Sequence, residues 1–63
     1  MAQHPRQVEY QANTKGQRYG IRCKYEWDTS AKAFAWKFFR RGVYLGKTTK
    51  QDKVLPLLEK YCA

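Results

Sequence analysis

Residues 18–27, RYGIRCKYEW, carry the clearest structural signal in this chain. From Tyr19 to Trp27, aromatic and apolar residues alternate with charged residues and one glycine. Side chains on a β-strand point to opposite faces in turn, so this period of two predicts a strand with one buried face and one wet face. The wet face carries Arg22 and Lys24, and the aromatic side chains belong to the core.

A second strand is predicted at residues 33–40, after a polar loop at residues 28–32. Because Lys37 is charged, we expect it and the alternate residues of its set, including Phe39, on the wet face. The opposite set faces the core and consists of Phe34, Trp36 and Phe38.

A tight turn and a third strand follow. Arg41-Gly42 supplies the turn, because glycine readily takes positive φ, and Arg40 then lies at the hairpin tip beside it. Residues 43–47 form the third strand, with Tyr44 on the wet face.

The C-terminal residues predict a helix. Apolar residues between Val54 and Cys62 recur at helical spacing and form a broad stripe. Pro56 is tolerated only in the first turn, so we expect the helix to begin near Asp52 or Lys53. The predicted fold is α+β, a three-stranded antiparallel sheet packed on one C-terminal helix in the order β-β-β-α.

Residues 1–17 are polar and rich in glutamine, and His4-Pro5 disfavours a helix. We therefore expect a flexible polar arm, followed by one nucleic-acid-binding domain at residues 18–63. Val8, Tyr10 and Ala12 alternate, so a short edge strand is the alternative.

The charge is strongly one-sided. The chain of 63 residues has a net charge of +8, and residues 15–53, with eleven basic and three acidic residues, account for all of it. A field of this sign attracts polyanions, such as nucleic acid or an acidic protein surface. No apolar run approaches the roughly 20 residues of a membrane span, and no signal peptide is evident, so we expect a cytoplasmic protein without a membrane partner.

The residue pattern does not predict an enzyme. His4 is the single histidine, and Cys23 faces the predicted core, where a thiol is inert. Two cysteines and one histidine at these spacings match no zinc site. We expect no catalytic residue, metal or cofactor, and reduced thiols, although a Cys23–Cys62 disulfide remains open.

The wet face of the sheet and its surroundings are the predicted binding site. Cations neutralise phosphates there, and the two rings can contact bases or sugars. The candidate residues are Arg22, Lys24, Lys37, Phe39, Arg40, Arg41, Tyr44, Lys47 and Lys50. We expect a small DNA-binding protein with an accessory or regulatory role in a phage or bacterium, associated with the nucleoid in the latter case. RNA ranks second, an inhibitor or adaptor that recognises an acidic protein surface is the alternative, and homodimerisation is left open.

The strand YGIRCKYEW, the hairpin AFAWKFFRRGVYLGKT and the helix KVLPLLEKY resemble, in their order, the arm-site-binding domains of phage integrases and the related plant AP2 domains. In both, one helix backs a three-stranded sheet that enters the DNA major groove. The resemblance implies that DNA contacts come from Arg22, Lys24, Lys37, Phe39, Arg41 and Tyr44. The stretch GKTTKQDK, residues 46–53, is also similar to the lysine-bearing helix start of double-stranded-RNA-binding domains, which carry a helix before the sheet. Because no such helix is predicted here, DNA ranks above RNA.

Overall fold

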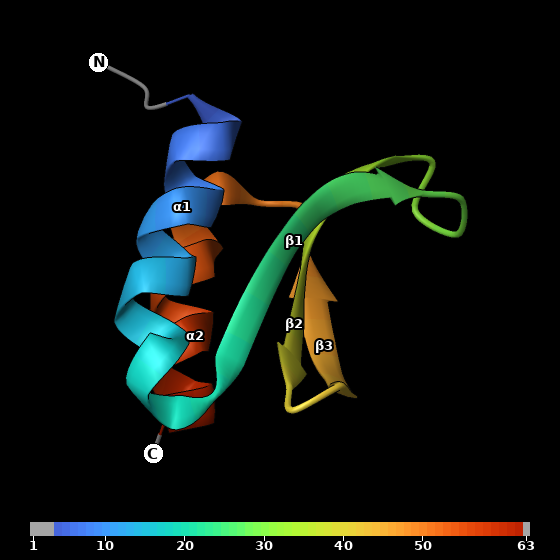
Figure 1. Ribbon diagram of the computed structural model, residues 1–63. Helices are drawn as coiled ribbons and strands as arrows, with labels where there is room; N and C mark the ends of the chain where they lie inside the picture. The colour runs from blue at the N-terminus through green and yellow to red at the C-terminus, as the bar shows by residue number, and fades with distance from the viewer. Residues whose placement is uncertain (1–3, 63) are drawn as a thin grey trace.

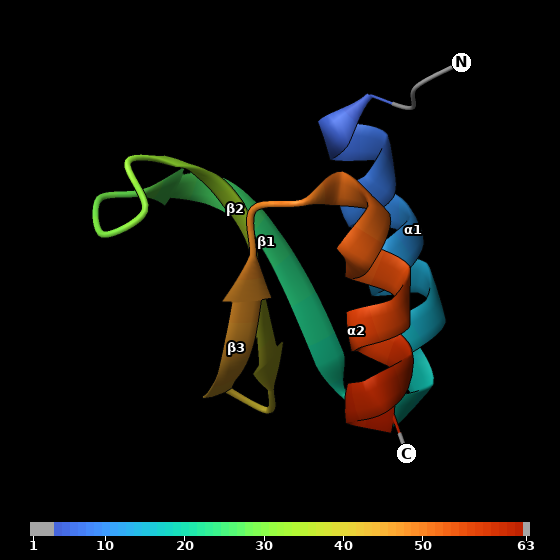
Figure 2. The same cartoon turned by 180° about the vertical axis from the view of Figure 1, so that it is seen from behind.

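In the computed structural model, residues 4–62 are described, and they form two layers, a three-stranded antiparallel sheet and two helices that cover one of its faces (Figure 1). The elements in chain order are α1 (Pro5–Gly16), the 3₁₀ helix η1 (Gln17–Tyr19), β1 (Ile21–Asp28), β2 (Ala33–Arg40), β3 (Val43–Thr48), the 3₁₀ helix η2 (Gln51–Lys53) and α2 (Val54–Cys62). The strand order β1-β2-β3 confirms the predicted sheet and makes β1 and β3 its edges. Seen from behind, α1 and α2 run side by side in the same direction (Figure 2).

The predicted order β-β-β-α with a flexible arm is wrong, because residues 5–16 form a helix. The His4 imidazole caps it by accepting from the Arg6 N–H (3.1 Å), and Pro5 occupies the first position, where its missing N–H costs nothing. The buried stripe consists of the small residues Val8, Ala12 and Gly16. Such a narrow stripe is a weak helical signal, and its first part reads equally well as a strand.

Polar side chains attach α1 to the free edge of β1. The Asn13 amide accepts from the Cys23 N–H and donates to the Cys23 carbonyl, both at 2.9 Å. The Glu9 carboxylate accepts from the Tyr25 N–H at 2.7 Å, and Arg6 donates to the Tyr25 carbonyl at 2.8 Å. An edge strand has unpaired backbone groups that can recruit other chains. Here the first helix satisfies four of them.

The first strand begins later than the alternation indicates. Gln17–Tyr19 form η1, and Gly20 at φ 74° turns the chain into β1. Glycine takes this left-handed conformation without the steric penalty of a side chain. Tyr19, predicted to be buried, is therefore exposed and precedes the strand.

The second turn and the last helix follow from local chemistry. Arg41 and Gly42 both have positive φ, as the favoured two-residue hairpin turn requires. After η2, helix α2 begins at Val54, and Pro56 lies in its first turn. Between the layers, the largest fully buried side chains are Phe38, Leu58, Val54 and Cys23.

The β1–β2 hairpin extends beyond the helices and curls away from them (Figures 1 and 2). Trp27 and Phe34 are paired in the register and lie on the same side of the sheet as the core residue Phe38. They were predicted to be buried, yet the hairpin curls away from the helices here, and their side chains are about half exposed.

Candidate nucleic-acid interface

The face of the sheet that the helices leave open carries most of the predicted binding residues. Cys23 pairs with Phe38 across β1 and β2 and points into the core, so their neighbours point the other way. Arg22 pairs with Phe39, which in turn pairs with Tyr44 on β3. The charged and aromatic residues on the open face are Arg22, Lys24, Glu26, Asp28, Lys37, Phe39, Tyr44 and Lys47.

Two of the predicted cations are engaged with acidic residues. Lys37 forms an ion pair with Glu26 at 3.3 Å. Lys47 donates to the Asp28 carboxylate, whose side chain is almost fully buried. The positive charge on the half of the face nearest the β1–β2 loop is therefore largely neutralised.

Asp28 also organises the loop between β1 and β2. Its carboxylate accepts from the backbone N–H groups of Ser30 (2.8 Å) and Ala31 (3.2 Å). The hydrogen bond from Lys47, followed by these backbone bonds, lowers the pKa of Asp28 to about 2. Through Asp28, Lys47 thus stabilises the loop of the β1–β2 hairpin.

The other half of the face contains a group that we call the basic patch, consisting of Arg22, Lys24, Phe39, Arg41 and Tyr44. Lys24 Nζ lies 5.7 Å from the centre of the Phe39 ring, and Phe39 packs on Tyr44 with ring centres 5.6 Å apart. Arg41 donates its backbone N–H to the Gly20 carbonyl at 3.1 Å, which brings the β2–β3 turn beside the start of β1.

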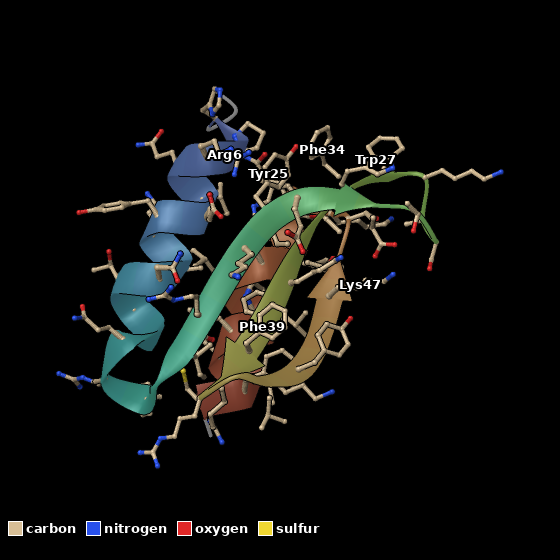
Figure 3. All side chains as sticks on the ribbon, turned by 45° about the vertical axis from the view of Figure 1, so that its right-hand side comes forward. Arg6, Tyr25, Trp27, Phe34, Phe39 and Lys47 are labelled. Atoms are coloured by element: carbon tan, nitrogen blue, oxygen red, sulfur yellow. The ribbon has the colours of Figure 1, made fainter. Side chains whose placement is uncertain are left out.

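The cations of the basic patch keep their charge available. Arg22, Lys24 and Arg41 line a shallow hollow with Phe39, and no acidic residue contributes to its wall. Within residues 4–62, none of these three side chains forms an ion pair. Figure 3 shows Phe39 on this open face, away from the loop between β1 and β2.

Two predicted residues lie away from the basic patch. Arg40 belongs to the helix-facing side of β2 and donates to the Tyr61 carbonyl near the end of α2. Lys50 precedes η2, and its N–H is bonded to the Thr48 hydroxyl at 3.1 Å. Arg40 therefore stabilises the junction between the layers, whereas Lys50 belongs to the approach to α2.

The sequence did not predict the exposed aromatic residues of the hairpin. Trp27 and Phe34 satisfy the pattern of core residues, and alternation along a strand does not report how far the opposing helices reach. Arg6 was also missed, because the segment that holds it was predicted to be an arm.

No helix in the described part of the chain is long and apolar enough to cross a membrane. Comparison with known proteins found no matching family model, no matching curated protein and no matching solved structure.

Proposed function

We propose that this protein binds duplex nucleic acid, DNA in the first place, through the basic patch. The observation that carries the proposal is the grouping of Arg22, Lys24 and Arg41 beside the packed rings of Phe39 and Tyr44, around a hollow that no acidic side chain of the described residues lines. Phosphates attract such a group, and the counterions that they release drive the association. The net charge of +8 adds long-range attraction.

The state of the rings favours backbone contacts over base stacking in the basic patch. Phe39 is packed against Tyr44 and has the Lys24 ammonium over its face. A ring with a covered face is a poor platform for an unstacked base, whereas the cations around it can reach phosphates. Contacts to phosphates position a duplex and do not read its sequence, so we expect weak sequence preference.

A salt titration tests the proposal. With three phosphate contacts, log K for a duplex of about 16 base pairs should fall against log salt with a slope of about −2.7. Replacing Arg22, Lys24 and Arg41 with Gln should abolish that slope and most of the affinity. The matched control removes three charges elsewhere, at Lys15, Lys53 and Lys60, and should retain the slope.

Two results would contradict the proposal. Equal losses in the patch variant and the control would show that only total charge matters. Dissociation constants above about 100 μM for every duplex at low salt would be weaker than ordinary non-specific binding. They would exclude duplex nucleic acid as the ligand. An acidic protein surface would then be the remaining polyanion.

Double-stranded RNA is a second candidate, supported by one observation. Helix α1 precedes the sheet, so the chain has the α-β-β-β-α order that the resemblance of residues 46–53 requires. The lysines near the start of α2 are divided, since Lys47 is bonded to Asp28 while Lys50 and Lys53 form no ion pair within the described residues.

Duplex RNA of the same length distinguishes the two candidates. Binding to RNA at least tenfold tighter than to DNA, lost on replacing Lys50 and Lys53 with Gln and retained in the Arg22, Lys24 and Arg41 variant, would replace the first candidate with the second. The opposite pattern of losses would support the basic patch.

A further inference from the structure

Three aromatic side chains form a row on the projecting hairpin, which we call the aromatic ridge: the half-buried Tyr25 and the exposed Phe34 and Trp27. The rings of Tyr25 and Phe34 are stacked, with centres 5.2 Å apart and planes 24° apart. Phe34 meets Trp27 edge to face at 5.5 Å. Figure 3 shows the row along the upper rim of the molecule, with Arg6 at one end.

The ridge is exposed because of the shape of the hairpin. Its residues lie on the helix-facing side, but the hairpin curls away from the helices (Figure 1). Tyr25 is still covered by Arg6 and Trp36, whereas Phe34 and Trp27 lie farther along the hairpin. Phe34 is 46% exposed and Trp27 is 53% exposed, whereas the next ring, Trp36, is buried. A contiguous apolar surface of this kind marks a binding site more often than isolated exposed residues do.

A cation stands at the end of the ridge. The Arg6 guanidinium carbon lies 5.1 Å from the centre of the Tyr25 ring, and its Nη1 donates to the Tyr25 carbonyl at 2.8 Å. The same Nη1 forms an ion pair with Glu9 at 3.2 Å, and the Arg6 side chain is 58% exposed. A ligand on the ridge can present an apolar face to Phe34 and Trp27 and an anionic group to the other nitrogens of the Arg6 guanidinium.

We propose that the aromatic ridge binds unpaired bases of a single nucleic-acid strand by stacking on Trp27 and on the exposed part of Phe34, with a phosphate near Arg6. Bases have a π-face that stacks on aromatic side chains whatever their sequence, and each carries a phosphate. The site is separate from the basic patch and extends the protein's ligands beyond duplexes. A second copy of the chain fits less well, because each copy carries +8 and three side chains present far less than the roughly 800 Å² per partner of a stable interface.

The test compares a thymidine oligonucleotide of about twelve nucleotides with an abasic oligonucleotide of the same length and charge. Stacking on the ridge should make the thymidine strand bind about 5- to 150-fold more tightly. It should also quench the fluorescence of Trp27, measured as the signal that Trp27→Phe removes. Equal affinities, or binding of the thymidine strand without quenching, would overturn the proposal.

Matched variants locate the effect. Trp27→Ala and Phe34→Ala should each reduce the preference for the thymidine strand over the abasic strand. Tyr10→Ala, which removes a ring that is 72% exposed on α1, should leave it unchanged. An equal loss with Tyr10→Ala would overturn the proposal, and circular dichroism confirms that each variant is folded.

Two further measurements separate this proposal from its neighbours. Sedimentation that shows self-association, abolished by Trp27→Ala, would assign the ridge to a second copy and refute base binding. The variant with Gln at Arg22, Lys24 and Arg41 should lose duplex binding yet keep the preference for bases. If the unmodified protein binds duplexes as proposed but does not prefer the thymidine strand over the abasic strand, the ridge proposal fails and the basic-patch proposal stands.

Discussion

Replacing Asn13 with Ala should open the edge of β1 that the first helix closes. The Asn13 side chain makes two hydrogen bonds to the backbone of Cys23, each at 2.9 Å, and a third to the Glu9 carbonyl within α1 at 3.0 Å. Alanine is the better helix former, so the substitution does not weaken the helix itself. Its cost comes from the strand edge.

The magnitude follows from the two bonds to Cys23. Each intramolecular hydrogen bond contributes about 0.5–1.5 kcal/mol, and a partly buried group left without a partner shifts the loss toward the upper value. The gain in helix propensity offsets roughly 0.5 kcal/mol. We expect a net loss of about 1.5–2 kcal/mol, which is large beside the roughly 3–9 kcal/mol typical of a domain of this size.

Urea unfolding and hydrogen exchange measure the effect. The Asn13→Ala variant should unfold at lower urea with an unchanged m-value, and the Cys23 amide should exchange faster. Thr14→Ala is the control, since the Thr14 hydroxyl bonds to the Tyr10 carbonyl of its own helix and not to the sheet. A loss below about 0.5 kcal/mol, or an unchanged exchange rate at Cys23, would refute the role of α1 in closing the edge.

Three other perturbations test different parts of the structure. A Cβ at Gly46 would collide with the Tyr61 hydroxyl oxygen, so Gly46→Ala should cost roughly 1–3 kcal/mol in thermal unfolding. Tyr61→Phe should restore part of that loss, and strictly additive losses would argue against the contact. The pKa of Asp28 is lowered to about 2, so its contribution to stability is complete above about pH 4 and is lost as the pH falls toward 2. Asp28→Asn should flatten the dependence of urea stability on pH in that window, and an unchanged slope would exclude this carboxylate. Burial raises the pKa of the Cys23 thiol to about 12. At pH 8 a disulfide reagent should therefore label Cys62 alone in the native protein, and both cysteines after denaturation. Rapid labelling of both in the native state would contradict the burial of Cys23.

The strands were predictable because their signal is local. The predicted bounds of the second strand, residues 33–40, agree with those of β2, and the turn at Arg41-Gly42 has the positive φ angles that its sequence favours. The N-terminal helix was not predictable in the same way. Its stripe of Val8, Ala12 and Gly16 is small, and much of its attachment to the sheet comes from polar side chains that hydropathy does not register.

The sequence predicted which face of the sheet carries most of the candidate site, but it did not predict the contacts that those residues make. Alternation assigned Lys37 correctly to the open side of the sheet, whereas Lys47 was predicted only as a binding residue beside that face. Both are held by acidic residues of another strand, which the pattern within one strand does not reveal. Arg40 was expected beside Arg41, but it lies on the helix-facing side, where it bonds to α2. Side-chain period within one strand determines the face, whereas ion pairing depends on which residues of other strands lie near, here diagonally rather than directly opposite.

The stretch RYGIRCKYEW determined by itself that the chain contains a strand with one buried face and one charged face. The net charge was likewise readable without a structure. The folded structure was needed to show that polar residues of an added helix bond to the edge of this strand, and that the hairpin curls away from the helices and leaves Trp27 exposed. Pleat periodicity acts between neighbouring residues, whereas the burial of a strand depends on where the opposing layer lies.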